Sequence, residues 1–141
     1  MKINHNLGFT LIEAMIVLGI IGIISAIAYP SYMKSVMRSN RVEAKTELMD
    51  AAQRLQRCYT SLASFNSTQC TVYNQIISTS AMYSRGKGYY QIAFKANADL
   101  TATKYTLEAT AVKAPQTKDT TDNCNKLTLD QDGKKLPDAC W

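Results

Sequence analysis

The feature that most constrains this chain is an apolar run near its N-terminus, residues 9–29, in which Glu13 is the single charged residue. As an α-helix rising about 1.5 Å per residue, this run would be roughly 31 Å long, enough to cross the hydrocarbon core of a membrane. A carboxylate inside that core costs on the order of 2.5–3.5 kcal/mol on insertion scales. Glu13 therefore requires an explanation that a plain membrane anchor does not supply.

The order of residues at the start of the chain differs from that of a secretory signal. In such a signal a small-residue cleavage site follows the apolar run, whereas here Gly8 precedes it and Lys2 supplies a short positive start. If cleavage falls between Gly8 and Phe9, residues 1–8 are a leader and the apolar helix stays on the mature protein. Glu13 can then pair with the free amine of Phe9 on a neighbouring subunit, which offsets the cost of both charges and fixes the axial register.

The segment "GFTLIE", residues 8–13, followed by the rest of the apolar run (residues 14–29) and Pro30, resembles the N-terminal signature of type IV pilins and the related pseudopilins. The short leader resembles that of the type IVa class. The resemblance implies cleavage between Gly8 and Phe9, and N-methylation of Phe9, by a prepilin peptidase/methyltransferase. It also implies storage in the bacterial inner membrane, and then incorporation with other pilin subunits into an extracellular pilus (fimbrium) by the pilus assembly machinery.

Three residues interrupt the apolar helix: Gly19, Gly22 and Pro30. Each glycine costs about 1 kcal/mol relative to alanine, and the proline removes a backbone hydrogen bond. Membrane helices tolerate such residues. They would equally let the helix bend or partly melt when it packs into a filament, as the family resemblance implies, and the sequence leaves both interpretations open.

Beyond Pro30 the chain becomes amphipathic, and we expect one helix from about Phe9 to about Thr60. Glu47 and Arg54 belong to the side that we expect to face water or neighbouring subunits. The predicted organisation is a leader (1–8), a transmembrane and filament-core helix (9–35) and a globular head (36–141). Apolar residues recur every three or four positions on the side expected to pack on a sheet: Leu48, Ala51, Leu55, Tyr59 and Leu62.

The sequence pattern in the remainder of the head predicts β-strands. Three segments have strand patterns, Tyr89–Ala96, Lys104–Val112 and Asn125–Gln131, and Asp132-Gly133 is a hairpin signal. Residues 61–88 read as a loop region in which "VYNQIIS" adds a helical turn or a short strand. We therefore expect an α+β fold, the type IV pilin fold. Its long N-terminal helix has a protruding apolar half and an amphipathic half packed on an antiparallel β-meander of three to four strands.

All four cysteines lie beyond the apolar run: Cys58, Cys70, Cys124 and Cys140. An even count in a small exported head predicts two disulfides and an oxidising compartment, whereas zinc sites use closer pairs. Three connectivities are possible. The sequential one closes short loops, each worth about 3 kcal/mol, and is favoured. The stretch from Cys124 to Trp141 resembles the C-terminal disulfide-bounded loop of the PilE-like minor pilins, with Trp141 expected as an apolar plug beside Cys140.

The sequence offers little for catalysis or metal binding. His5 is the only histidine and would leave with the leader, and no carboxylate or lysine pair forms a recognisable catalytic motif. The stretch "DQDG", residues 130–133, lacks the key ligands of a calcium loop and predicts a turn. We therefore predict no catalytic residue, no metal and no cofactor, and a protein that is not an enzyme.

The charge balance indicates an anionic partner. The chain has 16 Lys and Arg against 11 Asp and Glu, for a net charge of +5 at pH 7. Basic residues beside aromatic rings suit nucleic acid. The candidates are Arg85 and Lys87, which precede Tyr89 and Tyr90, and Lys134 and Lys135 in the C-terminal loop. The alternative is an ordinary solvated surface.

These features together predict a type IVa pilin, most closely a minor subunit that supports pilus biogenesis, twitching motility, adhesion or DNA uptake. One alternative is a DNA-receptor pilin that binds extracellular DNA during natural transformation. A second is a pseudopilin of a type II secretion system, which shares the N-terminal motif.

Overall fold

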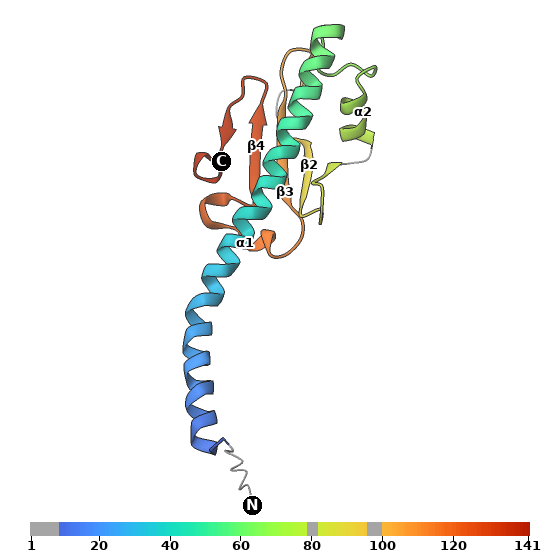
Figure 1. Cartoon of the computed structure of the whole chain (residues 1–141). Coiled ribbons are helices and arrows are strands. Elements are labelled where there is room, and N and C mark those ends of the chain that lie inside the picture. The colour runs from blue at the N-terminus through green and yellow to red at the C-terminus, as the bar shows by residue number, and fades with distance from the viewer. Residues whose placement is uncertain (1–8, 79–81, 96–99) are drawn as a thin grey trace, which may run out of the picture. The chain divides into compact units, whose positions relative to one another are not determined.

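The structure is a computed structural model, and it describes residues 9–78, 82–95 and 100–141. The chain divides into two compact units, Met1–Ser35 and Val36–Trp141. Figure 1 shows both units. Gly8, the predicted cleavage residue, lies outside the described residues.

The described part of the first unit is the beginning of helix α1, which spans Leu11–Leu62 and is helical through Pro30. Its apolar segment is long enough to cross a membrane, and none of it is buried. Thr10 precedes the helix, and its hydroxyl accepts a hydrogen bond from the Glu13 amide at 3.3 Å. Thr10 therefore acts as the N-cap, satisfying one of the amides that a helix start leaves free. The predicted helix bounds are correct to within two residues.

In the second unit, five antiparallel strands form one sheet in the order β1-β2-β3-β4-β5 within the described residues. The predicted α+β fold is confirmed, and its three predicted strands correspond to β2, β3 and β4. Two strands of two residues each were not predicted, so the expectation of three to four strands was too low. The bounds are β1 Met82–Tyr83, β2 Tyr90–Phe94, β3 Thr106–Ala111, β4 Lys126–Asp130 and β5 Lys135–Leu136.

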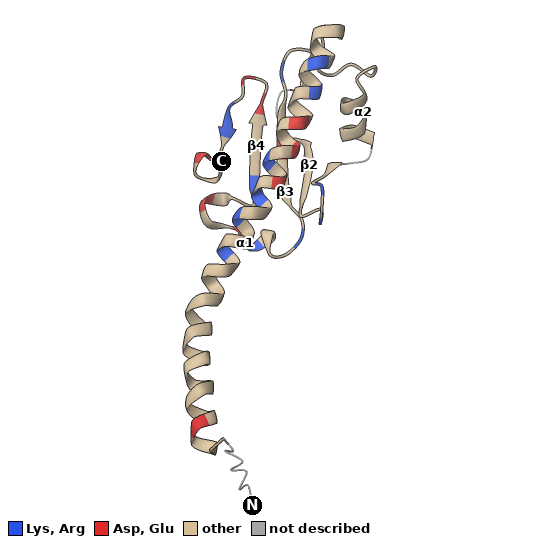
Figure 2. Cartoon of the chain, viewed as in Figure 1, with Lys and Arg blue, Asp and Glu red and all other residues tan. Residues whose placement is uncertain are grey.

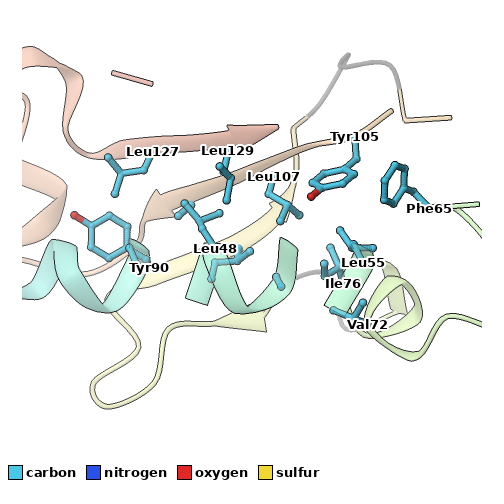
Figure 3. Packing of buried hydrophobic residues seen from close by; sticks show 14 of the residues in the cluster. Leu48, Leu55, Phe65, Val72, Ile76, Tyr90, Tyr105, Leu107, Leu127 and Leu129 are labelled. Carbon is cyan, nitrogen blue, oxygen red and sulfur yellow. The ribbon is translucent and has the colours of Figure 1, made fainter. Parts of the chain in front are cut away.

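The core lies between α1 and one face of this sheet (Figure 3). Leu48 and Leu55 of α1 are fully buried, as are Ile92, Leu107 and Leu127 from the three central strands. The register places Ile92 opposite Ala109 and Ala109 opposite Leu127, so the period-two pattern points one face of the sheet at the helix. The predicted inward side of α1 is confirmed.

The described residues between α1 and β2 include a short helix and a short strand. Helix α2, Thr71–Ser78, buries Val72 and Ile76 against the core, so "VYNQIIS" is a helix rather than a strand. β1 then pairs with β2, with Met82 opposite Ile92. The prediction of a loop over residues 61–88 was wrong for these parts.

Two disulfides close the head, Cys58–Cys70 and Cys124–Cys140. This is the sequential connectivity that the sequence favours. The first disulfide joins the end of α1 to the residue before α2. The second joins the segment before β4 to the last 3-10 turn, Asp138–Cys140; two further 3-10 turns, Gln116–Lys118 and Thr121–Asn123, lie between β3 and β4.

The prediction for Glu47 was wrong, because this side chain of α1 is buried and does not face water. Glu47 is 3% exposed, although its place in the helical pattern predicted contact with water. Arg85, from the turn between β1 and β2, covers it with its Nε 2.8 Å from the Glu47 Oε1. Burial of a carboxylate is tolerated here because a guanidinium neutralises it. Arg54, by contrast, is exposed as expected.

Candidate functional site

The turn between β1 and β2 carries two of the predicted basic residues. Arg85 is 72% exposed, yet its Nε lies 2.8 Å from Glu47 and its Nη2 lies 3.4 Å from Asp50. The turn depends on Gly86, whose φ of +81° lies in the left-handed region that favours glycine. A Cβ at this position would also lie only 3.1 Å from the Oε1 atom of Glu43. Two carboxylates thus neutralise the Arg85 guanidinium, which weakens its attraction for an external anion.

Lys87 is exposed in the same turn and lies near a third cation. The Lys113 ammonium donates a hydrogen bond to the Lys87 carbonyl at 2.9 Å, so the two lysines meet at this end of the sheet. The aromatic residues that follow differ in accessibility. Tyr90 is fully buried, with its hydroxyl accepting a hydrogen bond from Gln116 at 2.8 Å, and its ring cannot stack on a base. The predicted interleaving of basic and stackable residues is therefore incomplete at this turn.

The C-terminal loop carries the other two predicted residues, Lys134 and Lys135, both exposed. The Lys135 ammonium lies 5.2 Å from the centre of the Trp141 ring, and the Lys45 ammonium of α1 lies 6.0 Å from it. The indole Nε1 of Trp141 donates to the Leu136 carbonyl at 3.2 Å, which holds the ring near both cations. Trp141 also packs against the buried core, as the predicted plug would.

The loop from Cys124 to Trp141 carries three Lys and three Asp and is balanced in itself, and Lys45 of α1 adds a further cation beside Trp141. Partial burial lowers the pKa of Lys45, and the nearby cations Arg41, Arg38 and Lys135 lower it further. Arg41 is neutralised by Asp119, with its Nε 2.6 Å from the carboxylate. Within the described ranges, no ion pair joins Lys45, Lys134 or Lys135 to an acidic side chain. We call Lys45, Lys134, Lys135 and Trp141 the C-terminal basic cluster.

The four predicted residues do not form a single site. The turn with Arg85 and Lys87 joins the edge strand β1 to β2, whereas Lys134 and Lys135 lie at the opposite edge strand, β5 (Figure 2). Lys45 was missed because it is one charge among several on an amphipathic helix. Its role depends on a contact with Trp141, far away in the sequence, which no local pattern indicates.

For metals, the described segments contain no group of three or more His, Cys, Asp or Glu side chains that could hold an ion.

The fold and the N-terminal helix define the class of this protein. A helix that begins within "GFTLIE", at the start of a membrane-length apolar segment, and continues into a head in which it packs on a disulfide-closed antiparallel sheet, is a type IV pilin subunit. Within this class, the chain belongs to the family described as type IV minor pilin ComP, DNA uptake sequence receptor, whose sequence model matches residues 30–128. A second model, the prokaryotic N-terminal methylation motif, matches residues 3–29. Membership of this family favours the minor pilin over the secretion pseudopilin.

Individual relatives match a short segment of the chain. The type IV major pilin protein PilA of Myxococcus xanthus is 59% identical over 44 residues, which are 31% of this chain and 20% of that protein. The fimbrial protein EcpC of Eikenella corrodens is 62% identical over 37 residues, 26% of this chain and 24% of that protein. The matched segment thus spans a quarter or less of the length of these relatives. A type IV pilin structure from Shewanella oneidensis aligns with 74% of this chain and 97% of its own at 22% identity, with a TM-score of 0.49.

Proposed function

We propose that this minor pilin binds DNA through its head and presents it to the pilus machinery. The description of its family, a DNA uptake sequence receptor, motivates the proposal. The observation that carries it is the C-terminal basic cluster, whose three lysines have no carboxylate partner among the described residues. Cations without an ion-pair partner are free to neutralise phosphates and so to release the counterions bound to the DNA. The role is one of binding and assembly, and we propose no catalytic step.

Within this proposal the basic residues contribute unequally. Lys134, Lys135 and Lys45 contact phosphates, and Lys87 supplies a further contact at the other edge of the sheet. Arg85 contributes less than its exposure suggests, because binding DNA would compete with its pairing to Glu47 and Asp50. Trp141 orients two of the lysines instead of stacking on a base, since both ammonium groups already lie near its ring.

We also propose the route by which the subunit reaches the filament. Cleavage between Gly8 and Phe9 removes residues 1–8, and Phe9 is then N-methylated; the match to the N-terminal methylation motif supports this step. Residues 9–35 anchor the subunit in the inner membrane and then pack among other pilin subunits, with Glu13 facing the N-terminal amine of a neighbour. Flexibility at Gly19, Gly22 and Pro30 assists this packing. The prepilin peptidase/methyltransferase and the pilus assembly machinery are the partners that this route requires.

The test of DNA binding uses the full-length processed pilin in a mild detergent and a fluorescently labelled DNA duplex. Fluorescence anisotropy is measured over a range of salt concentrations, because each lost phosphate contact lowers the slope of log K against log salt by about 0.9. The double variant Lys134→Ala/Lys135→Ala should bind more weakly, with a slope lower by about 1.8. The matched control, Lys104→Ala/Lys118→Ala, removes the same charge from exposed positions elsewhere on the head. Equal losses in the two double variants would show that the C-terminal basic cluster is not the site, and absence of binding would reject the function.

A further inference from the structure

A second basic feature lies at the C-terminal end of α1. It is an open pocket of about 410 Å³ between the last turns of α1 and helix α2. Its volume lies within the range of about 300–1,000 Å³ that is typical of small-molecule sites. Arg54 and Arg57 line the α1 side, and Gln69 and Thr71 line the α2 side. Leu62, Val72 and Cys58 add apolar surface to the lining, which we call the apolar floor.

The pocket carries surplus positive charge. None of the described residues that line it is acidic. Arg54 lies 2.9 Å from Asp50, which also receives Arg85, so Arg54 keeps donors that this single contact does not use. Arg57 has no ion-pair partner in the part of the chain that the structure describes. The two guanidinium groups are three residues apart on one helix, a spacing that places them on neighbouring positions of one face.

The pocket is preformed. The disulfide Cys58–Cys70 ties the α1 wall to the segment that enters α2, and Cys70 is 1% exposed. Val72 is also buried, which fixes the first turn of α2 against the core. A ligand therefore does not have to order the walls, and little of its binding free energy is lost to ordering.

We propose that this pocket binds a phosphate group. Guanidinium groups match phosphate oxygens with paired N–H donors. The Thr71 hydroxyl and the Gln69 carboxamide add neutral donors on the opposite wall. The remaining volume and the apolar floor accommodate the group to which the phosphate is esterified. The site is separate from the C-terminal basic cluster and does not depend on the DNA-binding proposal. The phosphate group could belong either to a DNA phosphodiester or to a free phosphomonoester.

The first experiment titrates the full-length processed pilin in detergent micelles with inorganic phosphate. Amide NMR signals of Thr71 and Val72 and the Arg57 Nε–H signal should shift saturably. Sodium chloride at equal ionic strength should not reproduce the shifts. Arg57→Ala should weaken binding by about tenfold or more, and Arg57→Lys, which keeps the charge but loses the paired donors, should weaken it less. Lys118→Ala is the matched control and should leave binding unchanged.

The result that overturns the proposal is an absence of saturable shifts, or equal shifts with chloride. Both variants of Arg57 should retain the amide spectrum of the rest of the head, because the side chain is exposed and alanine and lysine are good helix formers. A spectrum that is unchanged outside the pocket therefore makes loss of phosphate shifts a loss of binding rather than of folding.

A second experiment identifies the source of the phosphate. The same variants are titrated with an oligothymidine that lacks terminal phosphates and, separately, with glycerol 1-phosphate. Saturable shifts of the same signals with the oligothymidine, lost in Arg57→Ala, assign the site to DNA. Shifts with glycerol 1-phosphate alone assign it to a phosphomonoester. The Lys134→Ala/Lys135→Ala variant should keep the phosphate shifts in either case, so failure of the DNA-binding proposal is distinguishable from failure of this one.

Discussion

Arg41 and Asp119 form a two-point ion pair that connects α1 to the segment between β3 and β4. The Arg41 Nε and Nη2 donate to the two carboxylate oxygens at 2.6 and 2.7 Å, and the Asp119 side chain is 3% exposed. Beside it, Gln116 is fully buried and donates to the Met37 carbonyl at 3.2 Å. Two side chains thus hold a segment with little apolar surface against the helix, and this segment leads into β4.

The first prediction concerns this ion pair. Arg41→Ala leaves the buried Asp119 carboxylate without its partner, so the free energy of unfolding should fall by about 3 kcal/mol or more. Chemical unfolding of the full-length protein in detergent, followed by near-UV circular dichroism, measures the loss. Arg54→Ala is the control, because it breaks a more exposed i, i+4 pair that is worth about 0.3–0.5 kcal/mol. Losses of similar size in the two variants would contradict the assigned role of Arg41.

The second prediction concerns Tyr105, which lies under Phe65 in the core, with the ring centres 4.8 Å apart. Burial raises the pKa of its hydroxyl to about 12, with a further contribution from Asp130. Because this pKa exceeds the value of about 10 in the unfolded chain, the stability that it contributes is complete below pH 10 and is lost as pH rises from 10 towards 12. Tyr105→Phe should therefore lose less stability over that interval, by about 2 kcal/mol. Unfolding curves at pH 9 and pH 11.5 check this, and parallel losses in the two proteins would refute it.

At the scale of the elements, α1 and the three long strands could be predicted because their patterns run over several turns or residue pairs. β1 and β5 could not, since two residues carry no period and each strand exists only through its partner. The burial of Glu47 could not be predicted for the same reason. It depends on Arg85, which is distant in the sequence and contacts Glu47 from the turn between β1 and β2. The candidate sites show this limit most clearly, because contacts such as Lys45 with Trp141 join distant segments.

The third prediction concerns α2, which is only eight residues long and too short to be stable alone. The Cys58–Cys70 disulfide, with a sequence separation of 12, holds its start against the end of α1. Replacing both cysteines by serine should lower the free energy of unfolding by about 2–3 kcal/mol. Amide hydrogen exchange should show loss of protection in α2, while β3 and β4 remain protected. The double serine variant of Cys124 and Cys140 is the comparison, and it should leave α2 protected; loss of α2 protection in both would show a general loss of stability instead.

At the scale of the whole molecule, the head buries its apolar surface internally, whereas the segment before Val36 does not. Large apolar side chains there are exposed: Leu18 is 69% exposed and Ile27 is 73% exposed. An apolar surface of this extent requires a membrane or other subunits to cover it. The two units of one chain thus follow different physical rules, one stabilised by its own core and disulfides, the other by its surroundings.

The last prediction separates two roles for Glu13. Its amide hydrogen bond to Thr10 places it at the third position of the helix, where a Glu or Gln side chain can also cap the helix start. Glu13→Gln keeps that capping ability but removes the charge that would pair with the amine of Phe9 in a neighbour. We expect both Glu13→Gln and Glu13→Ala to be cleaved after Gly8, yet to enter filaments at least tenfold less than the unmodified subunit, because an unpaired ammonium in an apolar environment costs several kcal/mol and each factor of ten corresponds to about 1.4 kcal/mol. Quantitative mass spectrometry of sheared filaments, following the peptide that begins at methylated Phe9, gives the ratio of incorporated to processed subunit. If Glu13→Gln enters filaments normally while Glu13→Ala does not, capping and not charge pairing explains why a carboxylate persists in this apolar helix.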